Sequence, residues 1–212
     1  MSKSKANIFV PSDIFIGIAS PNGRAPIHTI SALKDCGAYL GSNIYFVISQ
    51  GSSINKNRNH VKEYLLQTIP PDEVAKYTHI LTFWLDDDIF LDYSSVPQVV
   101  KFIVKAQQDA IKGKLIAYTA NYNRLTGDSS IMKERTYYAS PNYTKEEIGR
   151  MTGHETVVGM SGFGFLATPI PLDYIFHADR IGEDVYFWME NPDIKLKLWT
   201  GINLAHQKIA LF

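Results

Sequence analysis

The sequence predicts an α/β fold with a doubly wound, mostly parallel central sheet and helices on both faces. Short runs rich in β-branched and aromatic residues alternate with longer segments that carry apolar residues at helical spacing, and this alternation is typical of parallel α/β proteins. The run from Ile80 to Leu85 is predominantly apolar, as expected for a strand buried on both faces. At 212 residues the chain has the length of one domain, and we assign residues 1–212 to it.

Local signals support each element in turn. Ser20-Pro21-Asn22-Gly23 has turn composition after the first strand, and Pro26 stands early in the first helix, where its missing N–H costs nothing. Pro70-Pro71 ends the second helix, and Gly113 ends the helix before the fourth strand. Strands are expected at 13–19, 43–49, 80–85, 114–120, 156–160, 163–168 and 194–199. Helices are expected at 26–39, 54–69, 72–77, 96–112, 145–151, 171–177 and 185–190, the last opened by residues 181–184.

Residues 121–153 break the pattern. The segment is polar, tyrosine-rich and only weakly periodic, apart from the helix expected at 145–151. Long irregular segments inside a compact domain are usually lids, binding loops or disordered. We therefore expect a mobile loop over the active site.

Composition limits the classes of function. The formal net charge is zero, so nothing indicates a nucleic-acid-binding surface. Cys36 is the single cysteine, which excludes an intramolecular disulfide and fits a reducing compartment. The N-terminal residues lack the apolar core of a signal peptide, and no window is apolar over eighteen residues, so we expect no transmembrane segment and a cytoplasmic location. A homo-oligomer is left open.

Three consecutive carboxylates, Asp86, Asp87 and Asp88, follow the strand at 80–85. In open α/β sheets, ligands bind beyond the carboxyl ends of the strands. Adjacent carboxylates repel one another, and Mg²⁺ or Mn²⁺ relieves this repulsion while it also binds a substrate phosphate. A turn or a helix cap is the alternative, since Asp is common in both, but three in a row favour a metal or phosphate site.

Two further groups of polar residues follow the first two strands. Ser20, Asn22 and Arg24 lie in the turn after strand one, and Arg58 and Asn59 follow strand two. In a parallel sheet both groups share an edge with the aspartates. Small residues let a nucleotide approach the backbone, and the planar fork of arginine suits phosphate. The alternatives are an ordinary turn and, for Arg58 taken alone, a solvated helix residue, which is the simpler interpretation.

Glu183, Asp184 and His206 complete the candidates. Acids in a first helical turn stabilise the helix dipole, which is a sufficient explanation for one of the two carboxylates. A partly desolvated carboxylate can instead serve as a general base, because burial raises its pKa toward working pH. A lone histidine is usually structural, but near a carboxylate cluster it is a candidate third metal ligand.

In their order and spacing, these motifs resemble those of the GT-A-fold nucleotide-sugar glycosyltransferases, over roughly residues 13–207 and most weakly at 121–153. The D-x-D-type signature of that family is matched by Asp86-Asp87-Asp88 behind an apolar strand. The other matches are Glu183-Asp184 in GEDVYFW for the acidic pair facing the acceptor, Gly159–Phe165 for the glycine-containing acceptor loop, His206 for the late histidine, and Arg58-Asn59 for the Arg-Asn pair.

The resemblance implies a metal-dependent, inverting glycosyl transfer. Asp88 would bind Mn²⁺ or Mg²⁺, with His206 and Asp86 as further ligands, and Asp86 and Asp87 would hold donor or metal. Asp184 would be the base, with Glu183 beside it. The partners implied are a UDP- or GDP-sugar and a glycan, glycoprotein or other hydroxyl acceptor. Aromatic faces for a sugar are offered by Phe163, Trp84 and Trp188, for which the protein core is the simpler interpretation.

Two alternatives remain. A nucleotidyltransferase acting on a sugar phosphate would share the sheet and the acidic site, but it needs a basic, glycine-rich loop after strand one, of which Ser20–Arg24 is a faint version. A non-catalytic nucleotide- or carbohydrate-binding module on the same fold is the other. A P-loop, a G-x-G-x-x-G motif and a G-x-S-x-G elbow are all absent from the sequence.

Overall fold

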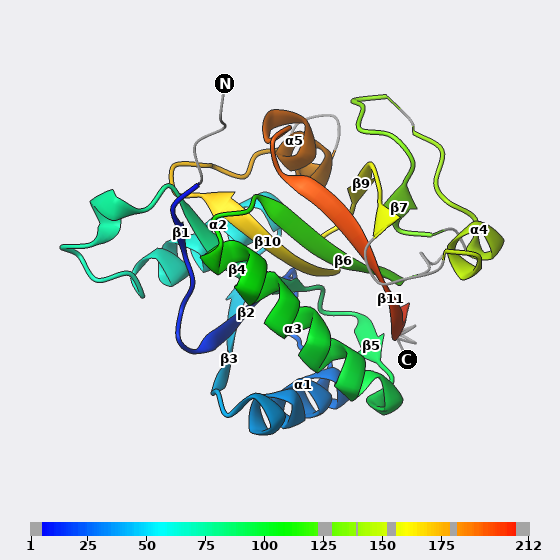
Figure 1. Cartoon of the computed structure of the whole chain (residues 1–212), viewed down its shortest axis with the longest axis horizontal. Helices are drawn as coiled ribbons and strands as arrows, with labels where there is room; N and C mark the ends of the chain where they lie inside the picture. Colours follow the sequence, from blue (N-terminus) through cyan, green and yellow to red (C-terminus); the bar gives the residue numbers. More distant parts are fainter. Residues whose placement is uncertain (1–5, 123–128, 139, 152–155, 179–181, 207–212) are drawn as a thin grey trace.

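A mixed sheet forms the centre of the molecule, with the strand order β3-β2-β4-β10-β6-β11-β5 (Figure 1). The computed structural model describes residues 6–122, 129–138, 140–151, 156–178 and 182–206. Strands β3, β2, β4, β6 and β11 run in one direction, while β10 and β5 are antiparallel to their neighbours. The expected α/β class with a mostly parallel sheet is therefore confirmed. The strand bounds are β2 Ile14–Ser20, β3 Ile44–Gln50, β4 His79–Leu85, β5 Ile89–Leu91, β6 Ile116–Tyr122, β10 Phe165–Pro171 and β11 Lys195–His206.

Short strands extend this sheet or lie apart from it. β1 (Ile8–Phe9) pairs with β4, and β8 (Thr156–Val157) pairs with β11. β7 (Ile131–Met132) and β9 (Met160–Ser161) form a separate pair.

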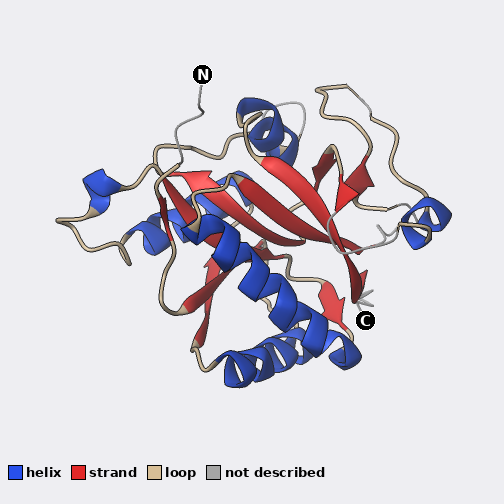
Figure 2. Cartoon of the chain, viewed as in Figure 1, coloured by secondary structure: helices blue, strands red, loops and turns tan. Residues whose placement is uncertain are grey.

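Helices cover both faces of the sheet (Figure 2). α1 (Ile27–Leu40) and α3 (Val96–Ile111) share one hydrophobic core with the sheet, and α2 (Ile54–Leu66) and α5 (Glu183–Glu190) share a second core on the opposite face. α4 (Lys145–Gly149) and the 3₁₀ turns η1 (Val74–Lys76) and η2 (Tyr93–Ser95) complete the set. None of the helices within the described residues is long and apolar enough to cross a membrane.

The apolar run at β4 forms the middle of this structure. Six of its seven residues are buried, because helices pack on both faces of the strand. Gly17 in β2 permits the close approach of α2, since a Cβ at Gly17 would lie 2.5 Å from Val61 and 3.0 Å from the Trp84 ring. Trp84 and Trp188 are fully buried, so both belong to the core.

The structure differs from the prediction in several places. The strand expected at 156–160 is split into β8 and β9, which pair with different strands, and the helix expected at 72–77 is only the 3₁₀ turn η1. Residues 171–177 form no helix: the chain makes a turn in which the N–H of Tyr174 donates to the carbonyl of Pro171, and it is irregular after this turn. Lys62 of α2 donates to the carbonyls of Leu172 and Tyr174, which are therefore not available for helical hydrogen bonds. The last strand does not end at Trp199 but continues to His206 through an irregularity at Gly201, whose φ is 88°. The aspartates are followed by a further strand, β5, which pairs with the end of β11.

The segment 121–153 was predicted to be a mobile loop. Its residues 123–128, 139 and 152–153 lie outside the described residues. The described part contains β7 and the expected helix, which appears as α4 with a capping box between Thr144 and Glu147. This part is thus more regular than the sequence pattern indicated.

Candidate functional site

One edge of the sheet gathers most of the predicted site residues. Because β2, β4 and β6 run in parallel, their carboxyl ends at Ser20, Leu85 and Tyr122 meet there. The antiparallel β10 begins at the same edge, and the N–H of Asp86 donates to the carbonyl of Gly164 at 3.0 Å. This arrangement brings Gly162–Gly164 beside the aspartates, although they are far apart in the sequence.

A cleft of about 330 Å³ opens at this edge. Apolar parts of its wall come from Ala19, Pro21, Ile54 and Phe163. The ionisable side chains that line it are Arg58, Asp86, Asp87, Asp88, Tyr122, Glu183 and Asp184. Two groups that the sequence predicted separately, the tip of β4 and the start of α5, therefore share one cavity.

Arg58 connects these two groups. Its Nε donates to Glu183 Oε1 at 2.8 Å, and its Nη2 donates to Asp86 Oδ1 at 3.3 Å. The guanidinium also lies 4.6 Å from the centre of the Phe163 ring and 5.5 Å from that of Trp84. With a side chain only 3% exposed, Arg58 is no solvated helix residue, and the simpler interpretation of it was wrong.

The ion pairs explain the pKa values of the two partners. Burial alone would lower the pKa of Arg58, but Asp86 and Glu183 outweigh burial and raise it, so the cation persists. Burial raises the pKa of Asp86, Arg58 opposes this effect, and the neighbouring Asp88 adds to it. Arg58 thus faces more carboxylates than it can neutralise, which leaves the cleft acidic.

Asp184 is a sheltered carboxylate with a raised pKa. Burial and the adjacent Glu183 raise its pKa to about 6, close to working pH. Its Oδ1 accepts the N–H of Val185 at 2.8 Å. The helix N-cap, Gly182, leaves room for this geometry, because a Cβ there would lie 2.5 Å from Asp184 Oδ1.

Tyr122 is a site residue that the sequence reasoning missed. Burial, together with Asp86 and Asp184, raises the pKa of its hydroxyl, which therefore stays protonated. The ring lies against Gly162 and Gly164: a Cβ on either would come within 2.6 Å of Tyr122 Oη. Tyr122 ends a parallel strand, so the argument applied to the aspartates would also have found it.

The turn after β2 contacts the aspartates through Ser20. Ser20 Oγ donates to Asp87 Oδ2 at 2.5 Å and accepts the N–H groups of Arg24 and Asn22 at 2.9 and 3.3 Å. The side chains of Asn22 and Arg24 do not line the cleft. Ser20 therefore positions Asp87, while Pro21 is the residue of this turn that lines the cleft.

The side chains of Asn59 and Asn57 form hydrogen bonds with backbone groups of other segments. Asn59 does not line the cleft; its side chain donates to the carbonyl of Phe176 at 2.8 Å and accepts the N–H of Phe176 at 2.7 Å. Asn57 is buried and donates to the carbonyls of Gly51 and Ser20. It was not predicted, because a polar residue in a first helical turn carries no special signal.

The structure locates the side chains of two of the three predicted metal ligands. Asp86 and Asp88 line the cleft, while of His206 only the backbone is described, and it pairs with Ile89, the residue after Asp88. Among the described residues, no group of three or more His, Cys, Asp or Glu side chains is arranged to hold a metal ion.

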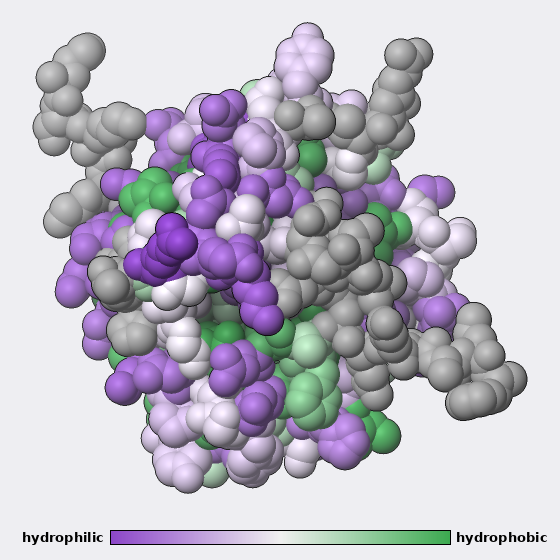
Figure 3. All heavy atoms as spheres, turned by 90° about the vertical axis from the view of Figure 1, so that its right-hand side faces the viewer, coloured by the Kyte–Doolittle hydropathy of each residue, from purple (hydrophilic) through white to green (hydrophobic). Residues whose placement is uncertain are grey.

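A second hollow, of about 490 Å³, lies between α4 and β11. It belongs to the part of the molecule at the right of Figure 1, and Figure 3 shows that side as largely hydrophilic surface interrupted by hydrophobic residues. Lys145 is the one ionisable side chain among the described residues that line this hollow. It therefore offers much less chemistry than the acidic cleft.

Comparison with known proteins gives no assignment. No protein-family model matches the chain, and no curated protein matches it significantly. A functional interpretation therefore depends on the geometry of the cleft.

Proposed function

We propose that the protein is a glycosyltransferase that moves a sugar from a nucleoside-diphosphate sugar to an acceptor hydroxyl, with a divalent cation as cofactor. One observation carries the proposal: the acidic tip of β4 and Asp184, whose pKa is raised to about 6, line the same cleft. Glycosyl transfer requires a site for phosphate and cation and, beside it, a carboxylate whose pKa lies near the pH at which the carboxylate acts.

In this mechanism Asp184 is the base. Its carboxylate takes the proton of the acceptor hydroxyl while the acceptor oxygen bonds to the anomeric carbon of the donor. The bond between that carbon and the diphosphate oxygen breaks at the same time, and the nucleoside diphosphate leaves with the bonding electron pair. A single displacement of this kind inverts the anomeric configuration. Glu183 is held by Arg58, which leaves the proton transfer to Asp184.

The cation site is assigned to Asp88, with Asp86 and His206 as the further candidates. Three preformed ligands are not needed, since Mg²⁺ is commonly bound by one or two carboxylates together with substrate phosphates. The chemistry of the donors fits, because Asp88 lies in the cleft and the backbone of His206 pairs with the next residue, Ile89. When bound, Mn²⁺ or Mg²⁺ would neutralise charge on the departing diphosphate.

The nucleotidyltransferase alternative is less well supported. Such an enzyme would use the turn after β2 to bind a triphosphate through backbone N–H groups. In this protein the N–H groups of Asn22 and Arg24 donate to Ser20 Oγ, so the turn has already used these two donors. A non-catalytic module would bind nucleotide without turnover. A measurement of activity therefore distinguishes such a module from an enzyme.

Calorimetric titration of UDP and GDP, with and without Mn²⁺, tests the proposal. We expect one nucleotide to bind only with Mn²⁺, Asp88→Ala to abolish this binding, and Asp184→Asn to retain it. Nucleotide release from a panel of nucleotide sugars, with sugars as acceptors, should fall about 10²–10⁴-fold in Asp184→Asn, while the exposed control Asp72→Asn keeps wild-type turnover. Absence of binding under both conditions, or full turnover in Asp184→Asn, would overturn the proposal.

A further inference from the structure

The edge strand β3 is unusual in this sheet. Five of its seven residues are apolar (IYFVISQ), yet none of them is buried. By contrast, β4, with a comparable composition, buries six of seven. Tyr45 and Ile48 are 46% and 44% exposed. Since burial of apolar surface is the main source of stability, β3 has the composition of a strand with neighbours on both sides but has only one, β2, among the described residues.

The opposite edge of the sheet is protected in the usual way. β5 is only three residues long and lies between Asp88 and Asp92, and short edge strands with nearby charges resist pairing with other chains. β3 has no charged residue, no proline and full length. The two edges of one sheet therefore differ, and only β3 is suited to accept another strand.

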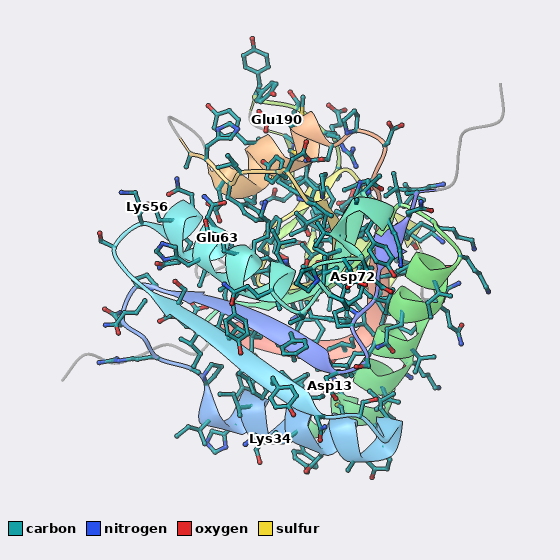
Figure 4. All side chains as sticks on the ribbon, turned by 90° about the vertical axis from the view of Figure 1, so that its left-hand side faces the viewer. Asp13, Lys34, Lys56, Glu63, Asp72 and Glu190 are labelled. Carbon is teal, nitrogen blue, oxygen red and sulfur yellow. The ribbon has the colours of Figure 1, made fainter. Side chains whose placement is uncertain are left out.

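Figure 4 views the molecule from the side of β3. The strand crosses the front of the view with α2 above it and α1 below it. Lys56 and Glu63 are exposed on α2, and a hollow of about 420 Å³ between α1 and the start of β3 is lined by Lys34, Ala38, Ile44 and other residues. The edge thus presents backbone groups, apolar side chains and a cavity together.

We infer that β3 is the interface for a second copy of this chain, formed by antiparallel pairing of β3 with β3 about a two-fold axis. A strand that pairs with itself must be self-complementary, because wherever residue i of one copy contacts residue j of the other, residue j also contacts residue i. An uncharged strand satisfies this condition, since no like charges face each other.

The charges beside the strand support a second copy as the partner. In each protomer, Gly17 of β2 is paired with Val47 of β3, and Gly17 lies under Val61 of α2. Val61 is therefore level with the middle of β3. Lys56 and Glu63 lie on opposite sides of this level along the helix axis. A two-fold axis through the middle of β3 therefore brings Lys56 of one protomer to the same side as Glu63 of the other, which gives charge complementarity.

This dimer leaves the acidic cleft accessible. The cleft lies at the carboxyl ends of the strands, and antiparallel pairing places the carboxyl ends of the two β3 strands at opposite ends of the interface. At the amino end of β3, the carboxyl end of the partner's β3 would lie beside the hollow next to Ile44. The inference is independent of the proposed function, because it uses none of the residues of the cleft.

Sedimentation equilibrium from about 1 to about 100 µM tests the interface. We expect the wild-type chain to reach twice its monomer mass of 23.9 kDa, and Ile48→Lys to remain monomeric, at least about tenfold weaker in association, because an edge lysine opposes strand pairing. Ile111→Lys at the exposed end of α3 is the matched control and should dimerise normally. A wild-type monomer throughout this range, or a dimeric Ile48→Lys variant, would overturn the inference.

Charge reversal at Lys56 and Glu63, both of which are exposed, tests the two-fold geometry. Lys56→Glu and Glu63→Lys should each weaken the dimer by about three- to tenfold, because each places like charges together. The double reversal restores opposite charges within the interface and should recover wild-type association. If the double variant lost as much dimerisation free energy as the two single variants added together, the assigned axis would be wrong.

Discussion

Two sheltered aspartates in this protein have opposite pKa shifts. Asp184, in the cleft, has a pKa raised to about 6 by burial and by Glu183. Asp109, near the end of α3, is 1% exposed, and burial likewise acts to raise its pKa. Hydrogen bonds from Tyr118, Lys114 and Lys105 outweigh this effect and lower it to about 2.

The difference lies in the number of donors that each carboxylate receives. Asp109 accepts from Tyr118 Oη at 2.7 Å and from Lys114 Nζ at 2.9 Å, with Lys105 Nζ at 3.2 Å. Asp184 accepts the N–H of Val185 and lies next to another acid. Burial alone therefore does not decide the role of a carboxylate: cationic partners make Asp109 structural, and their scarcity gives Asp184 a pKa suited to proton transfer.

Removal of Arg58 should have the largest effect, because the cleft depends on this buried cation. Arg58→Met leaves Asp86 and Glu183 without their partner and should lower the free energy of unfolding by about 3–5 kcal/mol at pH 7. The loss should be smaller at about pH 5 than at pH 7, because burial raises the pKa of Asp86 and protonation removes this buried charge that has lost its partner. Urea unfolding at both pH values measures it.

The matched control for Arg58 is an ion pair at the surface. Lys76→Met breaks the pair with Glu73, in which the lysine side chain is 61% exposed, and should change stability by less than about 1 kcal/mol. Equal losses for the two variants would contradict a special role for the buried pair.

Asp109 should give the next largest effect, through the pH dependence of stability. Its folded pKa of about 2 lies below the ordinary value of 3.8, so the folded state favours the ionised form. The stabilisation is present above about pH 4 and is lost as the pH falls toward 2. Allowing for the partly solvated lysines, we expect Asp109→Asn to lower stability by about 1–2 kcal/mol at pH 7 and by little at pH 2. A loss that did not depend on pH would indicate a packing defect instead.

Much of the sheet could be predicted from the sequence because its signals are local. Apolar runs and helical spacing predicted β2, β3, β4 and α3 to within two residues at each end. The position of β10 between β4 and β6 could not be predicted, since strand order depends on contacts between distant segments. The same limit applies to residues 171–177, whose non-helical form involves hydrogen bonds from Lys62 of a different element.

The site follows the same division. The aspartates and Glu183-Asp184 could be found because their residue types and positions carry chemical meaning. The burial of Arg58 between them could not, since an arginine at that helix position is most simply interpreted as solvated. The hydrogen bonds of Asn59 to the backbone of Phe176 could not be predicted either, because backbone partners leave no signal in the sequence.

Asp184 should affect stability with the opposite sign to Asp109. Its folded pKa of about 6 lies above the ordinary 3.8, so the folded state favours the protonated form, and the associated stability is lost as the pH rises from about 4 through 6. Asp184→Asn keeps an oxygen that can accept the Val185 N–H and removes the buried charge. We expect this variant to be roughly 1–2 kcal/mol more stable than the wild type at pH 7 and similar to it at about pH 4. Thermal unfolding at the two pH values measures the difference, with Asp72→Asn as the exposed control; a variant less stable at pH 7 would mean that the Asp184 charge stabilises the fold and that its role resembles that of Asp109.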